Sequence, residues 1–222
     1  MELPQPEAFT CKCLFGREWI RSFLGALLLL GLAFVCQHAA TVYALSYLLR
    51  PTSTYVGDLL LDNLPIVNLN FIVIEIALFA IVFGTLFVVF FRPRYILFSL
   101  KALALFIAIR ALFMSLTHVG IYPGYIMPGT GIFADIYSYF NMQTGFFFSG
   151  HTGMPILMAL IFWKRLFERN MFLILAFVFA VSVLFAHIHY SIDVLAAPFM
   201  AYVIFNMSRY LFKRDYELID SH

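Results

Sequence analysis

The sequence has few charged residues, and this scarcity excludes a water-soluble globule. Only 12% of the 222 residues are Asp, Glu, Lys or Arg, whereas 63% are hydrophobic and the mean hydropathy is +0.93. Such a chain has too little polar material to cover a surface that faces water. The formal net charge of +2 does not indicate nucleic acid as a partner, so we expect the membrane bilayer to be the solvent.

Cysteine is also scarce. The three cysteines, Cys11, Cys13 and Cys36, include no CxxC pair, which argues against a disulfide framework or a zinc site. Cys11 and Cys13 precede the first apolar run and are either acylated or solvated. Because the chain lacks low-complexity tracts, linkers and repeats, we expect one membrane domain over 22–212, between cytoplasmic segments 1–21 and 213–222.

Long apolar runs dominate the rest of the chain. A bilayer core about 30 Å thick needs about 20 apolar residues per helix, so the runs predict an all-α polytopic bundle with six transmembrane helices. A cleaved signal peptide ending near Ala40 is an alternative for the first run, but that run continues at full span length. The expected spans are Ser22–Leu49, Leu69–Phe91, Tyr95–Thr117, Phe146–Trp163, Met171–Ala186 and Ser191–Phe212.

Basic residues alternate between the two ends of these spans. Cytoplasmic flanks and short loops collect Lys and Arg, and on the opposite side only Arg50 occurs. The basic residues of the first side are Lys12, Arg17, Arg21, Arg92, Arg94, Lys164, Arg165, Arg169, Arg209, Lys213 and Arg214. We therefore expect a multi-pass protein with both termini cytoplasmic and with loops 50–68, 118–145 and 187–191 on the exoplasmic face.

Ionisable residues inside the apolar runs each need a partner or a task, because insertion of one costs about 2.5–3.5 kcal/mol at a helix centre. Lys101 lies near the cytoplasmic start of its span and can snorkel to the interface. Arg110 lies in the exoplasmic half, where an obligate cation requires a carboxylate or phosphate oxygens. Glu75 enters the second span from the same face, so a structural Arg110–Glu75 pair is the alternative to a phosphate site.

Two histidines and an aspartate are expected at the same exoplasmic depth. His189 and Asp193 are four residues apart, so the carboxylate can orient one ring nitrogen and leave the other as a nucleophile. His151 begins the fourth span at that face. Such a convergence of titratable groups is typical of an active site. His187 has no evident role, and His38, His118 and His222 are expected to be incidental.

A metal centre is the alternative interpretation, because two histidines and a carboxylate can ligate iron or zinc. However, Ser149 and Gly150 precede His151 directly and supply a hydroxyl and an uncovered backbone. Those groups suit phosphate oxygens, so we expect no metal and no cofactor.

Two segments resemble the catalytic motifs of a known family. Residues 148–152 (FSGHT) and 186–194 (AHIHYSIDV) are similar to those of the sphingomyelin synthase branch of the type 2 phosphatidic acid phosphatase (PAP2) superfamily. Asp58 and Asp62 resemble the acidic first exoplasmic loop of that branch. The resemblance covers residues 55–205 and implies a PAP2-like bundle of six helices. The spacing of that branch's arginine-containing motif is matched by Arg110, Met114, Thr117 and Pro123.

The resemblance implies a ping-pong phosphotransfer from a phospholipid donor. His189 would attack the phosphorus and release diacylglycerol, Asp193 would orient His189, and His151 would act as general acid and then as base. The acceptor would be a lipid hydroxyl, from ceramide or diacylglycerol. The phosphate oxygens would be bound by Arg110, Ser149, Gly150 and Tyr190, with Glu75, Asp58 and Asp62 as supporting residues.

The departures from the family pattern bear on the outcome of the reaction. Ser182 is followed by Val183 rather than by the Arg of the phosphatase branch, which favours the synthase branch. The synthases have Cys-Gly-Asp or Cys-Gly-Glu where this chain has Gln143, Thr144 and Gly145. Lipid phosphatase or phospholipase C activity therefore stays open beside transfer, as do a non-catalytic scaffold or transporter and self-association into a homo-oligomer.

Overall fold

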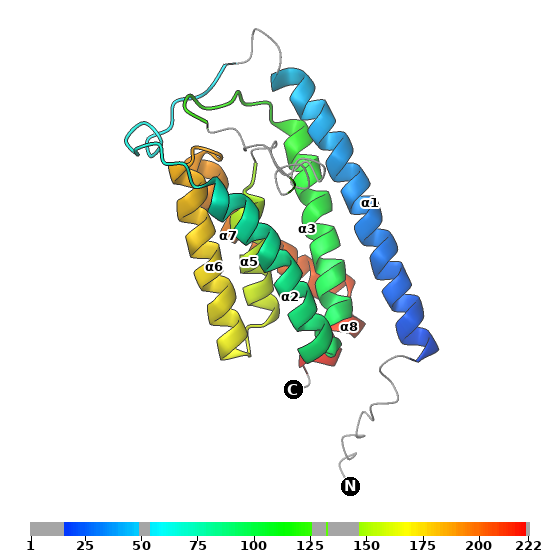
Figure 1. The fold of residues 1–222 in the computed structure, drawn as a ribbon. Coiled ribbons are helices and arrows are strands. Elements are labelled where there is room, and N and C mark those ends of the chain that lie inside the picture. Colours follow the sequence, from blue (N-terminus) through cyan, green and yellow to red (C-terminus); the bar gives the residue numbers. More distant parts are fainter. Residues whose placement is uncertain (1–15, 49–53, 126–131, 133–146, 221–222) are drawn as a thin grey trace.

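Every element of the computed structural model is a helix in the part of the chain that it describes, residues 16–48, 54–125, 132 and 147–220. The all-helical prediction is therefore confirmed for these residues. The elements, drawn in Figure 1, are α1 (Arg17–Leu48), the π-helix η1 (Phe71–Ile76), α2 (Ala77–Phe91), the 3₁₀-helix η2 (Pro93–Tyr95), α3 (Ile96–Leu116), α5 (Gly150–Ile161), α6 (Leu166–Phe185), α7 (Ser191–Leu211) and α8 (Lys213–Asp220).

Five helices of the described chain are long and apolar enough to cross a bilayer. They contain five of the six expected spans, with ends that differ by a few residues. The fourth expected span, 146–163, is helical only over the 12 residues of α5, because Ser149 caps its start and the chain turns after Ile161. A helix of this length rises about 18 Å, less than the bilayer core.

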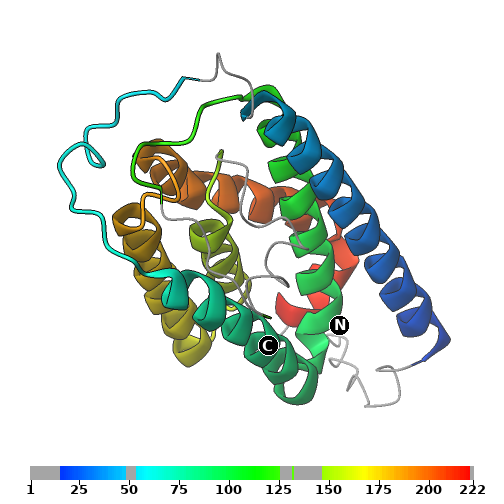
Figure 2. The same cartoon turned by 45° about the horizontal axis from the view of Figure 1, so that its top comes forward.

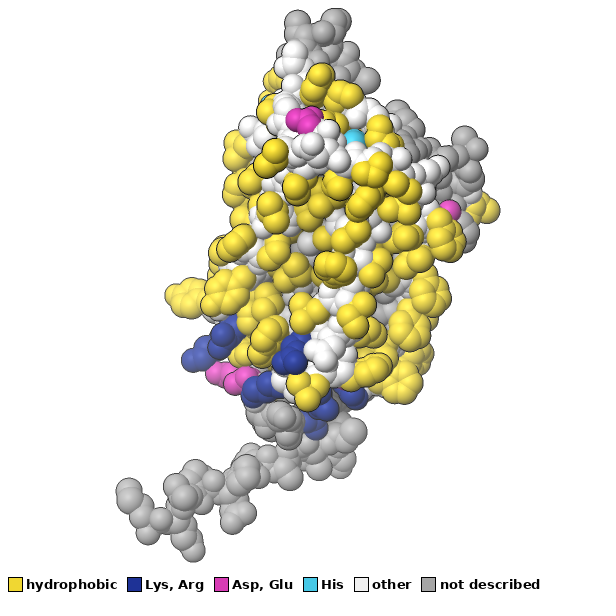
Figure 3. All heavy atoms as spheres, turned by 90° about the vertical axis from the view of Figure 1, so that its left-hand side faces the viewer, with side chains coloured by type: hydrophobic (Ala, Val, Ile, Leu, Met, Phe, Trp, Pro, Cys, Tyr) yellow, Lys and Arg dark blue, Asp and Glu magenta, His cyan; other side chains and the backbone are white. Residues whose placement is uncertain are grey.

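The central helices of the bundle are α3, α5 and α7. They pack on one another, with α6 beside α5 and α1 along the outside of α3 (Figures 1 and 2). Aromatic side chains fill the interior: Phe106 and Phe148 are fully buried, with ring centroids 5.2 Å apart, and Phe162 stacks on Tyr95. The exposed surface of the bundle is a broad apolar band (Figure 3).

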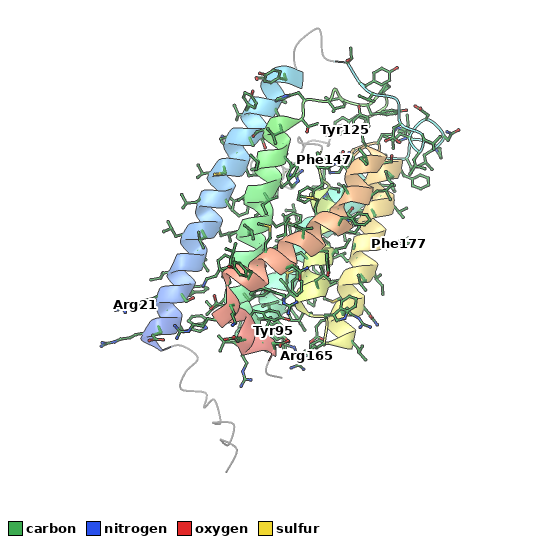
Figure 4. The ribbon with its side chains drawn as sticks, turned by 180° about the vertical axis from the view of Figure 1, so that it is seen from behind. Arg21, Tyr95, Tyr125, Phe147, Arg165 and Phe177 are labelled. Atoms are coloured by element: carbon green, nitrogen blue, oxygen red, sulfur yellow. The ribbon has the colours of Figure 1, made fainter. Side chains whose placement is uncertain are left out.

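Charge is segregated along the bundle, as the basic pattern predicts. Lys and Arg side chains gather below the apolar band in Figure 3, and Figure 4 places Arg21 and Arg165 at that end. Tyr125 and Phe147 lie at the opposite end in the same view. The described parts of loops 50–68, 118–145 and 187–191 share the end opposite the basic residues (Figure 1).

Ion pairs join the helices at the basic end. Lys101 does not merely snorkel: its Nζ lies 2.5 Å from Oδ2 of Asp215 on α8 and 2.8 Å from Oγ of Ser22 on α1. Arg92, after α2, donates from Nε to Glu168 on α6 at 2.7 Å. The helix α8, within the expected tail, was not predicted from the sequence, and its Asp215 faces the bundle.

Candidate active site

The junction of α6 and α7 places two of the expected residues. The helix α6 ends in a Schellman motif, in which the amide of Ile188 donates to the carbonyl of Val183 at 2.9 Å and His187 takes the left-handed conformation, with φ of 52°. This turn directs the chain back into the bundle. His189 follows at 4% exposure, one residue before Tyr190, the N-cap of α7.

The first turn of α7 holds Asp193 beside His189. Nδ1 of His189 lies 3.5 Å from Oδ2 of Asp193, and the aspartate is 2% exposed. The same carboxylate oxygen accepts from the amide of Tyr190 at 3.1 Å, which fixes it at the helix N-terminus. The separation is an ion-pair distance, longer than a closed hydrogen bond, and contacts of this kind shorten when a substrate binds.

The start of α5 places His151 opposite this pair. The ring centroids of His151 and His189 are 6.3 Å apart, and Nε2 of His151 lies 3.1 Å from the carbonyl oxygen of Val73 in η1. A carbonyl oxygen only accepts, so this nitrogen carries hydrogen. The amide of Ser149 donates to the backbone carbonyl of Asp193 at 3.1 Å, which joins the two motif segments directly.

Arg110 lies against the segment that precedes α5. Its Nε donates to the carbonyl of Phe148 at 2.9 Å, one of its terminal nitrogens lies 3.1 Å from Sδ of Met114, and the residue is 8% exposed. A Cβ at Gly150 would lie 3.5 Å from the same Nε, so the guanidinium group covers that glycine. The structure thus brings Arg110 to residues 148–150.

The alternative pairing of Arg110 with Glu75 is not formed. Within the described chain, no ion pair joins the two residues, and Oε2 of Glu75 is buried without a hydrogen-bond partner. Glu75 lies in η1, whose π-helical geometry sets the direction of its side chains differently from the regular helix that was expected.

Tyr190 and Asp58 connect loops 50–68 and 118–145 to α7. The hydroxyl of Tyr190 donates to the carbonyl of Gly120 at 2.8 Å and accepts from the amide of Val56 at 3.3 Å. Oδ2 of Asp58 accepts from the amide of Ser191 at 2.7 Å. Tyr190 therefore makes loop contacts, and its expected role in phosphate binding stays a prediction.

Asp62 accepts a hydrogen bond from the hydroxyl of Tyr122 in loop 118–145. The pKa of Tyr122 is raised to about 12, mainly by this hydrogen bond and to a smaller extent by burial. Tyr122 also packs edge-on against His187 at 5.3 Å. Asp62 thus connects two loops through Tyr122, and its contact with the histidine region is indirect.

His187 is the residue of this region that sequence reasoning left without a role. Its ring is 4% exposed, and neither of its nitrogens has a hydrogen-bond partner. The sequence signal for His187 is its position just after an apolar run, where the residue that ends a helix in the left-handed conformation is usually Gly or Asn. Of the incidental histidines, His118 stacks on Tyr47 at 3.9 Å and His38 lies on α1.

Several predictions concern residues outside the described part of the chain: Cys11, Cys13, His222 and the departure at Gln143, Thr144 and Gly145. Among the residues that the structure does describe, no three His, Cys, Asp or Glu side chains lie together as a metal-binding group.

A bundle of long apolar helices with a buried histidine–aspartate pair facing a second histidine at one end is consistent with a class, the multi-pass membrane proteins. Comparison with protein families is more specific. Residues 144–210 match the family described as PAP2 superfamily C-terminal, which supports membership of the PAP2 superfamily and a membrane enzyme of the lipid phosphatase or phosphotransferase type. The matched segment includes His151, His189 and Asp193. Comparisons with curated proteins and with solved structures found no match.

Proposed function

We propose that this protein is an integral-membrane phosphotransferase, similar to sphingomyelin synthase, that moves a phospholipid head group to ceramide or diacylglycerol through a phosphohistidine. The observation that carries the proposal is the arrangement of His189, paired with Asp193, opposite His151. A phosphoryl group between a nucleophile and a proton donor needs about 3 Å on each side, which suits a ring separation of 6.3 Å.

In the first step, Nε2 of His189 attacks the phosphorus, because Nδ1 faces Asp193. A P–N bond forms, the P–O bond to the glycerol breaks, and His151 donates a proton to the leaving alkoxide. In the second step, His151 removes the proton of the acceptor hydroxyl, a new P–O bond forms and the P–N bond breaks. Arg110 offsets the charge on the phosphoryl oxygens.

The same site supports hydrolysis as the second candidate. If water rather than a lipid hydroxyl reaches the phosphohistidine, the enzyme is a phosphatase or a phospholipase C. The match to the PAP2 family does not distinguish transfer from hydrolysis. A non-catalytic scaffold or transporter is the remaining alternative, and it predicts no turnover of any phospholipid.

The membrane arrangement that we propose has six spans, with α5 as a short fourth span enclosed by α3, α6 and α7. Both termini are cytoplasmic, and the histidines lie on the exoplasmic side. The described contacts of α5 with all three helices support this arrangement, because a helix enclosed by protein does not need to match the full bilayer thickness.

The experiment that tests this function incubates the purified protein with phospholipids of different head groups, with and without ceramide and diacylglycerol, and identifies all products by mass spectrometry. Transfer predicts a new lipid that carries the donor's head group and forms only when the acceptor is present. Hydrolysis predicts phosphate or a phosphorylated head group without a new lipid.

Variants make the assay specific to the site. His189→Ala should lower kcat at least about 1,000-fold, because the covalent step is lost. His118→Ala is the matched control: it removes an exposed histidine at the same end of the bundle and should keep wild-type turnover. Full activity of a folded His189→Ala protein would eliminate the proposed nucleophile.

A further inference from the structure

Asp58 is a buried carboxylate whose two oxygens are both occupied by backbone amides. Oδ1 accepts from Leu60 and Leu61 at 3.0 and 3.1 Å, and Oδ2 accepts from Ser191 at 2.7 Å. The residue is 7% exposed. With this many donors already in place, the carboxylate is committed to the backbone, and it is not available as a catalytic base.

The start of α7 is capped only in part by its own residues. The carboxylate of Asp193 accepts from the amide of Tyr190, the N-cap residue, while the hydroxyl of Tyr190 bonds to the loops. The first amides of a helix have no partner within the helix, and their positive dipole end favours a carboxylate. Asp58 satisfies the amide of Ser191 from a loop that lies 133 residues earlier in the chain.

The turn that Asp58 caps also holds the proposed catalytic pair. Asp193 is two residues after Ser191, and it approaches His189 through the oxygen that accepts from Tyr190. The backbone carbonyl of Asp193 accepts from the amide of Ser149, which precedes His151. A shift of this turn would therefore change the separation of His189 from both Asp193 and His151.

We propose that Asp58 is a positioning residue, which acts through the amide of Ser191 to hold Asp193 against His189. This inference rests on the proposed function, and it assigns to the first exoplasmic loop a task in setting the geometry of the nucleophile.

The titration of Asp58 does not interfere with its test. Burial raises its pKa, but hydrogen bonds from the backbone of Ser191 and Leu61, from the Ser191 hydroxyl and from the backbone of Leu60 lower it by more, so the net pKa lies below the usual 3.8. A carboxyl with a lowered pKa contributes its stabilisation above its usual pKa and loses it as the pH falls through the lowered value. The contacts of Asp58 are thus complete near neutral pH.

The first variant is Asp58→Asn. Its single oxygen can still accept from Leu60 and Leu61, but its amide group cannot accept from Ser191. We expect kcat per folded enzyme to fall about ten-fold, with KM within two-fold, because the loss affects the reaction step rather than lipid binding.

The second variant removes the donor instead of the acceptor. Ser191→Pro lacks the amide hydrogen, and Pro is favoured at the first position of a helix. It also lacks the hydroxyl, which contributes a second hydrogen bond to Asp58, so Ser191→Ala, which keeps the amide, is its control. Tyr190 already has φ of −65° and ψ of 154°, which a residue before Pro can keep. We expect the same loss of kcat, with KM again nearly unchanged, as for Asp58→Asn.

A double-mutant cycle joins the two variants. If Asp58 acts through this amide, the combined variant should be no slower than either single one, and its thermal midpoint should show the same lack of additivity. Asp220→Asn, which removes an exposed carboxylate at the other end of the bundle, should match wild type in kcat and KM, and its thermal midpoint should fall only slightly because it loses an exposed ion pair with Lys164.

The outcomes separate this inference from the proposed function. Wild-type kcat and additive thermal midpoints in folded Asp58→Asn and Ser191→Pro would overturn the positioning role while wild-type lipid turnover stands. A lowered thermal midpoint alone, with kcat per folded enzyme unchanged, would also overturn it, because the contact would then be merely structural. Absence of turnover in the wild type would remove the proposed function, and the thermal cycle would still test the Asp58–Ser191 contact.

Discussion

Single side chains at the end of the bundle opposite the basic residues carry most of the proposed chemistry, and Arg110 shows how the sequence limits what such a residue does. A cation placed in the outer half of an apolar helix needs oxygen ligands, and the structure supplies one from the carbonyl of Phe148. The expected alternative, Glu75, makes no pair with it. The phosphoryl oxygens of a lipid are further ligands that we propose for the guanidinium group.

Arg110→Lys should therefore lower kcat about 100-fold, because an ammonium group cannot contact the Phe148 carbonyl and two phosphoryl oxygens with the geometry of a planar guanidinium. The measurement is lipid turnover per folded protein. Arg94→Lys makes the same change at an exposed site at the basic end and should leave turnover unchanged. Near-normal turnover of Arg110→Lys would assign Arg110 a structural role on Phe148.

His187 marks the limit of sequence reasoning at this scale. The sequence places His187 and His189 two residues apart, and no feature of it distinguishes their roles. The fold separates them, because the Schellman turn directs one ring toward Tyr122 and the other toward Asp193. A backbone conformation of this kind depends on the end of α6, and composition does not predict it.

Among the elements, α5 differs most from its prediction. An apolar run of the right length predicted a full span, but the helix occupies only its middle. The N-cap at Ser149 and the hydrogen bond from its amide to Asp193 fix the start of α5. Hydropathy does not register such contacts, so the length of this helix could not be predicted.

Close packing of α5 on α3 depends on Gly153. A Cβ at that position would lie 2.7 Å from the ring of Phe106, which is fully buried against Phe148 and has little room to move. Gly153→Ala should lower the free energy of unfolding by about 1–3 kcal/mol, the usual effect of overpacking, and should lower the thermal midpoint in detergent.

Gly84→Ala is the matched control for this contact. A Cβ at Gly84 in α2 would meet nothing within 4 Å, so this variant should unfold at the wild-type temperature or slightly above it, since Ala favours a helix. Equal midpoints for Gly153→Ala and the wild type would show that α3 can move away from α5 without cost.

For the whole molecule, the segregation of charge predicts an orientation. The start of α1 and α8 lie at the basic end, where Arg214 contacts Glu18, and cytoplasmic flanks collect basic residues. We expect Leu59→Cys to react with a membrane-impermeant maleimide in intact cells and Glu217→Cys to react only after permeabilisation. Both variants would be made in a chain whose native cysteines are replaced, and their labelling would be compared by gel shift.

Labelling of position 217 in intact cells would contradict a cytoplasmic C-terminus. Labelling of both positions in intact cells would indicate damaged membranes, for which a cytoplasmic marker protein is the control. The reverse pattern would place the histidines on the cytoplasmic side and would change which leaflet supplies the lipids.

The sequence by itself determined the solvent, the helical class, the approximate spans and the segregation of charge, because these depend on hydropathy and on where Lys and Arg occur along the chain. It also indicated which side chains meet at one end. Only the tertiary structure decided that α5 is short, that Arg110 contacts Phe148 rather than Glu75, and that Asp58 caps α7. Each of these depends on hydrogen-bonding groups from distant segments, whose pairing is set by how the helices pack and not by any local pattern.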